Sequence, residues 1–104
     1  KRNWENFARN VLTHDRGKLS YFIIDNETDL SYGGGQLGIQ EPAKVVDFNR
    51  IAFQVARSVD GSIRIESSPA TSPFTDYNKR MLDAGLAQYC DVVGTHMYGG
   101  QLEL

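Results

Sequence analysis

Helical and strand patterns alternate three times along this chain, and that alternation limits its possible folds more than any other feature. The helical stretches, in which apolar residues recur at three- and four-residue spacing, are 3–14, 42–59 and 75–89. The strand stretches, which are short runs rich in apolar residues, are 18–25, 62–66 and 91–97. Because helices that alternate with strands connect parallel strands of one sheet, we expect an α/β fold with three parallel strands and three helices.

The first strand pattern, 18–25, is apolar with almost no polar alternation. Such a pattern is typical of a strand buried on both faces, as in parallel sheets. Three parallel strands alone would leave two edges and an apolar face uncovered. We therefore expect 1–104 to be a single fragment of a larger sheet or barrel, or a chain that covers its sheet edges by self-association.

Charge and hydropathy exclude two classes of partner. The chain has 11 basic and 13 acidic residues, a net charge of −2, with no basic stripe that would indicate a nucleic-acid surface. Its apolar runs, such as 21–24, are far shorter than the roughly 20 residues that span a membrane. We expect a soluble chain that binds neither nucleic acid nor membrane, and no pattern specifies its localisation.

Cofactor and metal chemistry find no support in the sequence. Cys90 is the only cysteine, which excludes an internal disulfide, and it is interpreted as a small buried residue rather than a catalytic thiol. The two histidines, His14 and His96, fall on different elements, so no metal site is expected. The glycines at 33–35 lack the Lys-Ser/Thr that follows in a phosphate-binding loop, and we interpret them as a flexible loop lining a cleft.

Polar side chains follow each predicted strand. These segments are 25–29, 66–68 and 95–98, and they contribute carboxylates, an amide, an imidazole and a phenol. Since the carboxyl ends of parallel strands meet at one edge, we expect these groups to converge on one rim, where α/β folds place their functional sites.

Four segments resemble clan A glycoside hydrolases, the retaining (β/α)8 enzymes. They are 21–27 (YFIIDNE), 48–53 (FNRIAF), 57–65 (RSVDGSIRI) and 89–99 (YCDVVGTHMYG). The likeness covers 4–99, corresponds to the third helix through the sixth strand of that barrel, and is closest to members acting on xylosides and arabinosides. It implies a partial TIM barrel and a carbohydrate substrate.

The resemblance also implies roles for individual residues. Glu27 would be the catalytic acid/base, with a pKa raised by burial and by a second carboxylate. Asn26 would bind the sugar 2-hydroxyl, and His96 and Tyr98 would orient the nucleophile or the sugar. Thr28 stands where many members have proline.

The second carboxylate of a retaining pair is expected on a seventh strand, which this sequence does not contain. Glu66 ends the second predicted strand but does not match the position of the family nucleophile. We therefore predict that the 104-residue chain alone is inactive and needs the remainder of the barrel.

Simpler interpretations stay open for each site residue. Glu27 could be a solvated loop carboxylate, Asn26 a turn residue or the acceptor of an N-glycosylation sequon, His96 a core histidine and Tyr98 a plain rim aromatic. The alternative function is a non-catalytic α/β module that binds carbohydrate or self-associates through its sheet edges.

Overall fold

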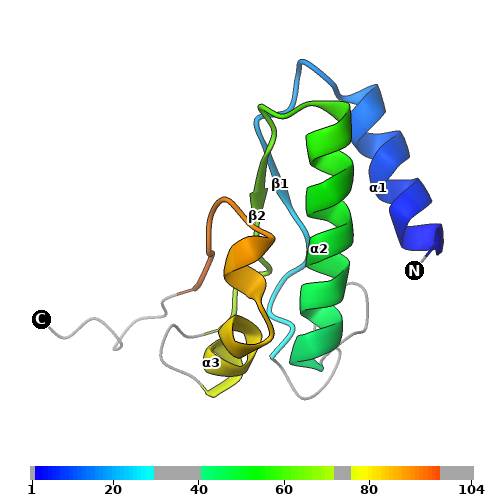
Figure 1. Ribbon diagram of the computed structural model, residues 1–104. Coiled ribbons are helices and arrows are strands. Elements are labelled where there is room, and N and C mark those ends of the chain that lie inside the picture. The colour runs from blue at the N-terminus through cyan, green and yellow to red at the C-terminus, as the bar shows by residue number, and fades with distance from the viewer. Residues whose placement is uncertain (1, 30–40, 72–75, 97–104) are drawn as a thin grey trace, which may run out of the picture.

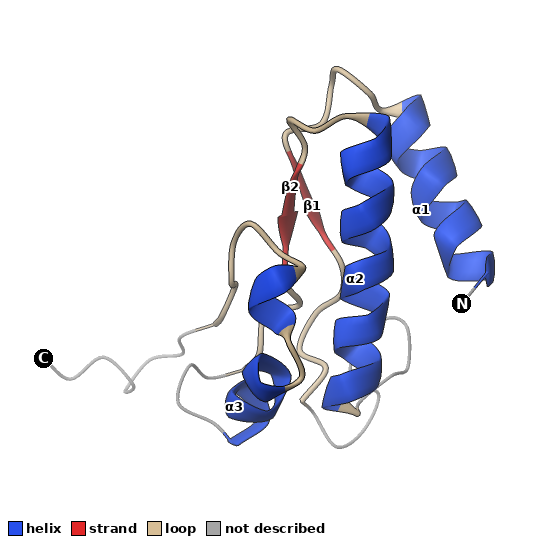
Figure 2. Ribbon diagram, viewed as in Figure 1, coloured by secondary structure: helices blue, strands red, loops and turns tan. Residues whose placement is uncertain are grey.

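The computed structural model describes residues 2–29, 41–71 and 76–96. Within them the chain is a mixed α/β structure (Figures 1 and 2). Its elements in chain order are α1 (Arg2–His14), β1 (Tyr21–Ile23), α2 (Pro42–Val59), β2 (Arg64–Glu66), α3 (Asp76–Asp83) and the 3-10 helix η1 (Leu86–Gln88). None of the helices in these ranges is long and apolar enough to cross a membrane.

Two of the three predicted strands form, and they are parallel as expected. Their register pairs Tyr21 with Arg64 and Ile23 with Glu66. Both strands are shorter than predicted: turns take up their first residues, and β1 also ends at Ile23, two residues before the predicted end. The Leu19 amide bonds to the Asp15 carbonyl at 3.1 Å, and the equivalent turn closes before β2.

The third predicted strand is not formed as a continuous ladder. The segment runs beside β2 and the residues after it, and pairs with them at two isolated parallel bridges, Glu66 with Val92 and Ala70 with Thr95. Backbone hydrogen bonds form at the first bridge, where the Val92 amide donates to the Ile65 carbonyl at 3.2 Å and the Ser67 amide donates to the Val92 carbonyl at 3.0 Å. Next to that bridge side chains act as the acceptors: the Asp91 carboxylate accepts the Ile65 amide at 2.9 Å, and the Ser67 hydroxyl accepts the Gly94 amide at 3.0 Å. The prediction of a regular strand at 91–97 was therefore wrong over its described part.

The helices gather around α2, which contacts α1, α3, η1 and β2. Trp4 is 8% exposed and donates its indole N–H to the Phe48 carbonyl at 3.0 Å, as expected of a core residue. Phe7, predicted on the same buried stripe, is 56% exposed. The largest apolar cluster lies between α1, α2 and the inner face of the strands.

The expectation that the first strand is buried on both faces was wrong. Phe22 and Ile24 face the helical layer and pack into the core. Tyr21 and Ile23 point the other way and are 56% and 52% exposed. The physical reason is that the described helices cover only one face of the sheet.

The third predicted helix, 75–89, is divided in two. Gly85 has φ +98, a left-handed conformation that ends an α-helix at low steric cost. The chain re-forms only the short η1 after it. Of the apolar residues in this stretch, Met81 and Leu86 are buried, whereas Leu82 is 51% exposed.

Candidate functional site

The polar segments that follow the strands lie side by side at the carboxyl ends of β1 and β2. The Glu27 amide donates to the Pro69 carbonyl at 2.8 Å, which fixes the residues after β1 against those after β2. The His96 amide donates to the Ala70 carbonyl, also at 2.8 Å, which brings the third segment to the same place. The expected convergence on one rim is therefore present among the described residues.

Glu27 and His96, which are 69 residues apart in sequence, are in direct contact. The His96 Nδ1 lies 2.9 Å from the Glu27 Oε1. The Glu27 side chain is 17% exposed and the His96 side chain 37% exposed, so neither is a fully solvated group nor a core residue. The sequence left His96 as either a site residue or a core histidine. Its contact with the Glu27 carboxylate at the rim favours the site residue.

The backbone of Glu27 adopts φ +48, the only positive φ among the described non-glycine residues. Glutamate is disfavoured in this left-handed region because its Cβ approaches the following carbonyl. Such conformations persist where surrounding contacts hold them, and they are common at functional sites. The Pro69 and His96 contacts supply that restraint.

Asn26 lies directly before this turn. Its backbone N–H donates to the Asp25 Oδ1 at 2.8 Å, so Asp25 stabilises the start of the turn. The Asn26 side chain lines the cavity described below. Tyr98, the fourth predicted site residue, and the glycines at 33–35 lie outside the described residues.

Two further hydrogen-bonded pairs fix the loop that follows Glu27. Thr28 is 1% exposed, and its hydroxyl accepts the Tyr77 hydroxyl at 2.8 Å. Asp29 accepts both the amide and the hydroxyl of Thr71, the latter at 2.6 Å. Burial raises the pKa of Tyr77, so its hydroxyl stays protonated and able to donate. Thr28 thus anchors this loop on α3.

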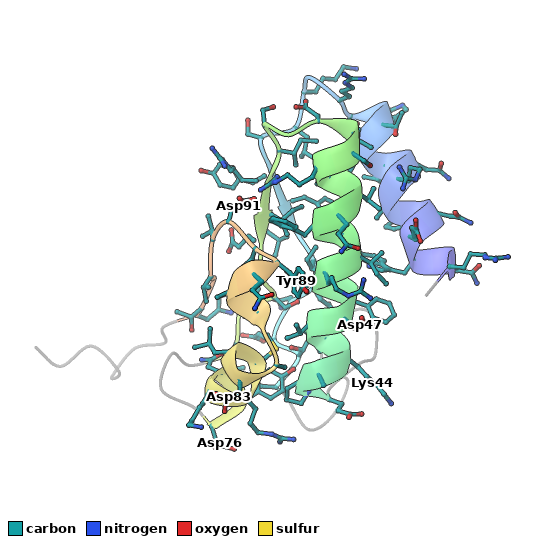
Figure 3. All side chains as sticks on the ribbon, in the orientation of Figure 1. Lys44, Asp47, Asp76, Asp83, Tyr89 and Asp91 are labelled. Carbon is teal, nitrogen blue, oxygen red and sulfur yellow. The ribbon has the colours of Figure 1, made fainter. Side chains whose placement is uncertain are left out.

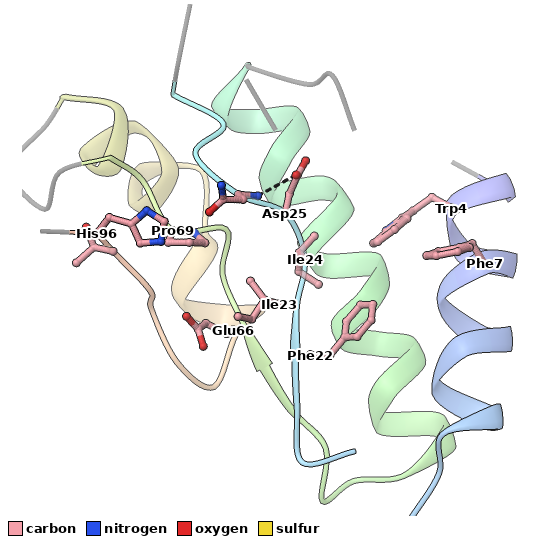
Figure 4. Close-up of a pocket in the computed structure, with 11 residues that line it drawn as sticks. Trp4, Phe7, Phe22, Ile23, Ile24, Asp25, Glu66, Pro69 and His96 are labelled. Atoms are coloured by element: carbon pink, nitrogen blue, oxygen red, sulfur yellow. Dashed lines mark hydrogen bonds between the residues drawn. The ribbon is translucent and has the colours of Figure 1, made fainter. Parts of the chain in front are cut away.

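A cavity of about 590 Å³ opens beside these groups (Figure 4). Figure 4 shows Glu66 and His96 on one side of β1 and the aromatic pair Trp4 and Phe7 on the other. The full lining is Trp4, Phe7, Phe22, Ile23, Ile24, Asp25, Asn26, Glu66, Pro69, Thr95 and His96. Glu27 is not part of this lining, but it contacts His96, which is.

Thiol and metal chemistry gain no support from the geometry. Burial, and after it the nearby Asp91 charge, raises the pKa of Cys90, which disfavours the thiolate needed for nucleophilic attack. The thiol donates to the Leu86 carbonyl at 3.4 Å. In the part of the chain that the structure describes, no three potential ligands are grouped to hold a metal ion.

The sequence pattern did not indicate the Tyr77–Thr28 and Asp29–Thr71 pairs. It did place Glu66 at the rim, as part of the segment 66–68 at the end of the second predicted strand, but it assigned no role to Glu66.

No protein-family model, curated protein or solved structure matches this chain. The chemistry of the site's own residues is therefore what supports a function.

Proposed function

We propose that this chain carries the acid/base half of a retaining glycoside hydrolase built as a (β/α)8 barrel, with Glu27 as the catalytic acid/base. The observation that carries the proposal is the 2.9 Å contact between Glu27 and His96 at the carboxyl ends of parallel strands. A partly exposed carboxylate, fixed in a disfavoured backbone conformation beside an imidazole and an amide, is a suitable arrangement for proton transfer.

Glu27 would act twice in a retaining mechanism. As an acid it protonates the glycosidic oxygen when the leaving group departs, and as a base it later removes a proton from the attacking water. His96 suits both steps, because its Nδ1 can donate to the carboxylate or, in the other tautomer, accept from the protonated acid. Asn26, in the cavity wall, would hydrogen-bond the sugar 2-hydroxyl.

The nucleophile would come from the remainder of the barrel. Retaining enzymes hold their two carboxyl groups about 5 Å apart, so the second carboxylate must approach Glu27 from a strand outside these 104 residues. The exposed face formed by Tyr21 and Ile23 is the surface that the rest of a barrel interior would cover. Alone, the chain would not hydrolyse glycosides.

The same exposed face favours one alternative. Tyr21 and Ile23, both more than half exposed, would also suit a non-catalytic module that self-associates through its sheet. Size-exclusion chromatography with light scattering separates the two proposals: a stable dimer that buries this face would favour self-association.

Glu27→Gln in a protein that supplies the remaining strands tests the catalytic role. We expect turnover of an unactivated glycoside to fall about 10²- to 10⁴-fold, the usual contribution of general acid–base catalysis. Azide should partly restore turnover of an activated aryl glycoside, because the small anion needs no general base. The exposed Glu5→Gln is the matched control. Unchanged activity of Glu27→Gln, or clear turnover by the isolated chain, would refute the assignment.

A further inference from the structure

Glu66 is a second carboxylate in the cavity wall, and none of the roles above uses it. It is the last residue of β2 and is paired in register with Ile23. It lines the same cavity as Asn26 and His96 (Figure 4). A ligand in this cavity is therefore within reach of all three residues.

The Glu66 carboxylate is not engaged by another described residue. Arg64, two positions earlier on β2 and so on the same face, pairs instead with Asp91 at 3.6 Å. Within residues 2–29, 41–71 and 76–96, neither a hydrogen bond nor an ion pair involves the Glu66 side chain, which is half-buried. A carboxylate has about four acceptor positions and no donor in its ionised form, so what it can bind is a set of hydroxyl or N–H donors.

Gly94 makes room for Glu66 in this position. A Cβ built on Gly94 would lie 2.4 Å from the Glu66 Oε1, closer than real carbon and oxygen atoms approach. The Gly94 backbone cannot easily yield, since its amide is held by the Ser67 hydroxyl at 3.0 Å and Ser67 is fully buried. An alanine at 94 would therefore displace the Glu66 side chain without removing it.

We propose that Glu66 is a specificity-determining residue that accepts hydrogen bonds from hydroxyl groups of the bound glycoside. A carboxylate whose two oxygens have no partner among the described residues matches a vicinal diol, and its charge strengthens each O–H···O⁻ bond. The inference rests on the proposed glycoside-binding function but not on the catalytic role of Glu27. Glu66 selects the sugar, while Glu27 acts on the glycosidic oxygen.

The test is a two-dimensional NMR titration of the isotope-labelled 104-residue chain with methyl β-D-xylopyranoside and methyl β-D-glucopyranoside. We expect saturable shifts near Asn26 and His96, and a dissociation constant raised about tenfold in Glu66→Gln, because a charge-assisted hydrogen bond becomes a neutral one. Gly94→Ala should weaken binding similarly. The controls are Glu5→Gln, and Gly61→Ala, whose added Cβ meets nothing within 4 Å.

Monodeoxy analogues of the tighter glycoside locate the hydroxyl that Glu66 accepts. For the unmodified chain, at least one analogue should have a dissociation constant about tenfold higher than that of its parent sugar. For Glu66→Gln, the same analogue and its parent sugar should have equal dissociation constants. Each variant's own spectrum reports whether it is folded. Binding that Glu66→Gln and Gly94→Ala leave unchanged would overturn the role of Glu66 and leave the proposed function standing. No binding of either glycoside would overturn both.

Discussion

The two ends of the sheet treat their carboxylates differently. Asp91, which begins the third segment (Figure 3), accepts the Ile65 amide and pairs with Arg57 and Arg64. At the other end, Glu66 has no partner among the described residues and Glu27 contacts His96 from a disfavoured backbone conformation. The end at Asp91, called the satisfied end below, has its carboxylate fully bonded within the chain. At the end of Glu66 and Glu27, called the open end, the Glu66 carboxylate can still accept hydrogen bonds from a ligand.

This difference predicts that folding stability and ligand binding depend on different ends of the sheet. Arg57 extends the satisfied end into the core, since it donates to the Ile63 carbonyl at 2.8 Å and stacks over the Phe53 ring at 4.4 Å. A carboxylate removed from that end should weaken folding. A carboxylate neutralised at the open end should change ligand binding and leave folding nearly intact.

The largest expected effect is that of Asp91→Ala. The substitution leaves the Ile65 amide without its acceptor and Arg57 without its counter-charge, and we expect the free energy of unfolding to fall by about 2–3 kcal/mol. Urea denaturation followed by circular dichroism measures the loss. A change below about 0.5 kcal/mol would show that the satisfied end does not hold the fold.

The two arginines that reach Asp91 should differ. Arg57→Ala removes the Ile63 hydrogen bond and the Phe53 contact as well as the ion pair, and should cost about 1–2 kcal/mol. Arg64→Ala removes only a 3.6 Å pair from a side chain that is 56% exposed, and should cost about 0–0.5 kcal/mol. Equal losses in the two variants would contradict this ranking.

Low pH should reduce the stability that Asp91 contributes at the satisfied end. Burial alone would raise the pKa of Asp91, but the Ile65 amide, the Arg57 guanidinium and the charge of Arg64 together hold it below its ordinary value of 3.8. Because the pKa is lower in the folded chain, Asp91 contributes its full stabilisation above the unfolded pKa and loses it as the pH falls through the folded value. We expect the free energy of unfolding to drop below about pH 4, and to drop less in Asp91→Ala. Parallel curves for the two proteins would contradict the assignment.

The smallest expected effect on stability is that of Glu66→Gln, at the open end. With no described partner to lose, the variant should unfold within about 0.5 kcal/mol of the unmodified chain. Thermal and urea denaturation both measure it. A loss comparable to that of Asp91→Ala would mean that Glu66 belongs to the fold, and the contrast between the two ends would fail.

The sequence predicted best the elements that local pattern specifies. Helix α2 has the predicted bounds, 42–59, because Pro42 suits a first turn and one apolar stripe runs along its length. The third strand was predicted from its apolar run, but its backbone pairing is limited to isolated bridges, and next to the first of them the Asp91 carboxylate and the Ser67 hydroxyl accept backbone amides. No local pattern distinguishes a carboxylate that substitutes for a ladder partner from one on a solvated turn.

The position of the candidate site could be predicted from the sequence, but the side-chain hydrogen bonds that hold its loop could not. Because parallel strands have their carboxyl ends at one edge of the sheet, the sequence predicted that Asn26, Glu27 and His96 lie close together. Their roles stay predictions. The Thr28–Tyr77 pair joins residues 49 apart through side chains alone, and periodicity carries no signal for such a contact. Glu66 was set aside because it did not match the family nucleophile, not because its position at a strand end was uninformative.

The left-handed backbone at Glu27 has an evolutionary consequence. Glycine would occupy φ +48 without the cost of about 1 kcal/mol that a side chain brings. Drift constrained only by folding should therefore move position 27 toward glycine or asparagine. In a saturation library at this codon, selection for folded protein alone should enrich those residues, while selection for the proposed hydrolysis should recover glutamate. The backbone itself thus marks position 27 as one where the benefit of the side chain must exceed its cost to the fold.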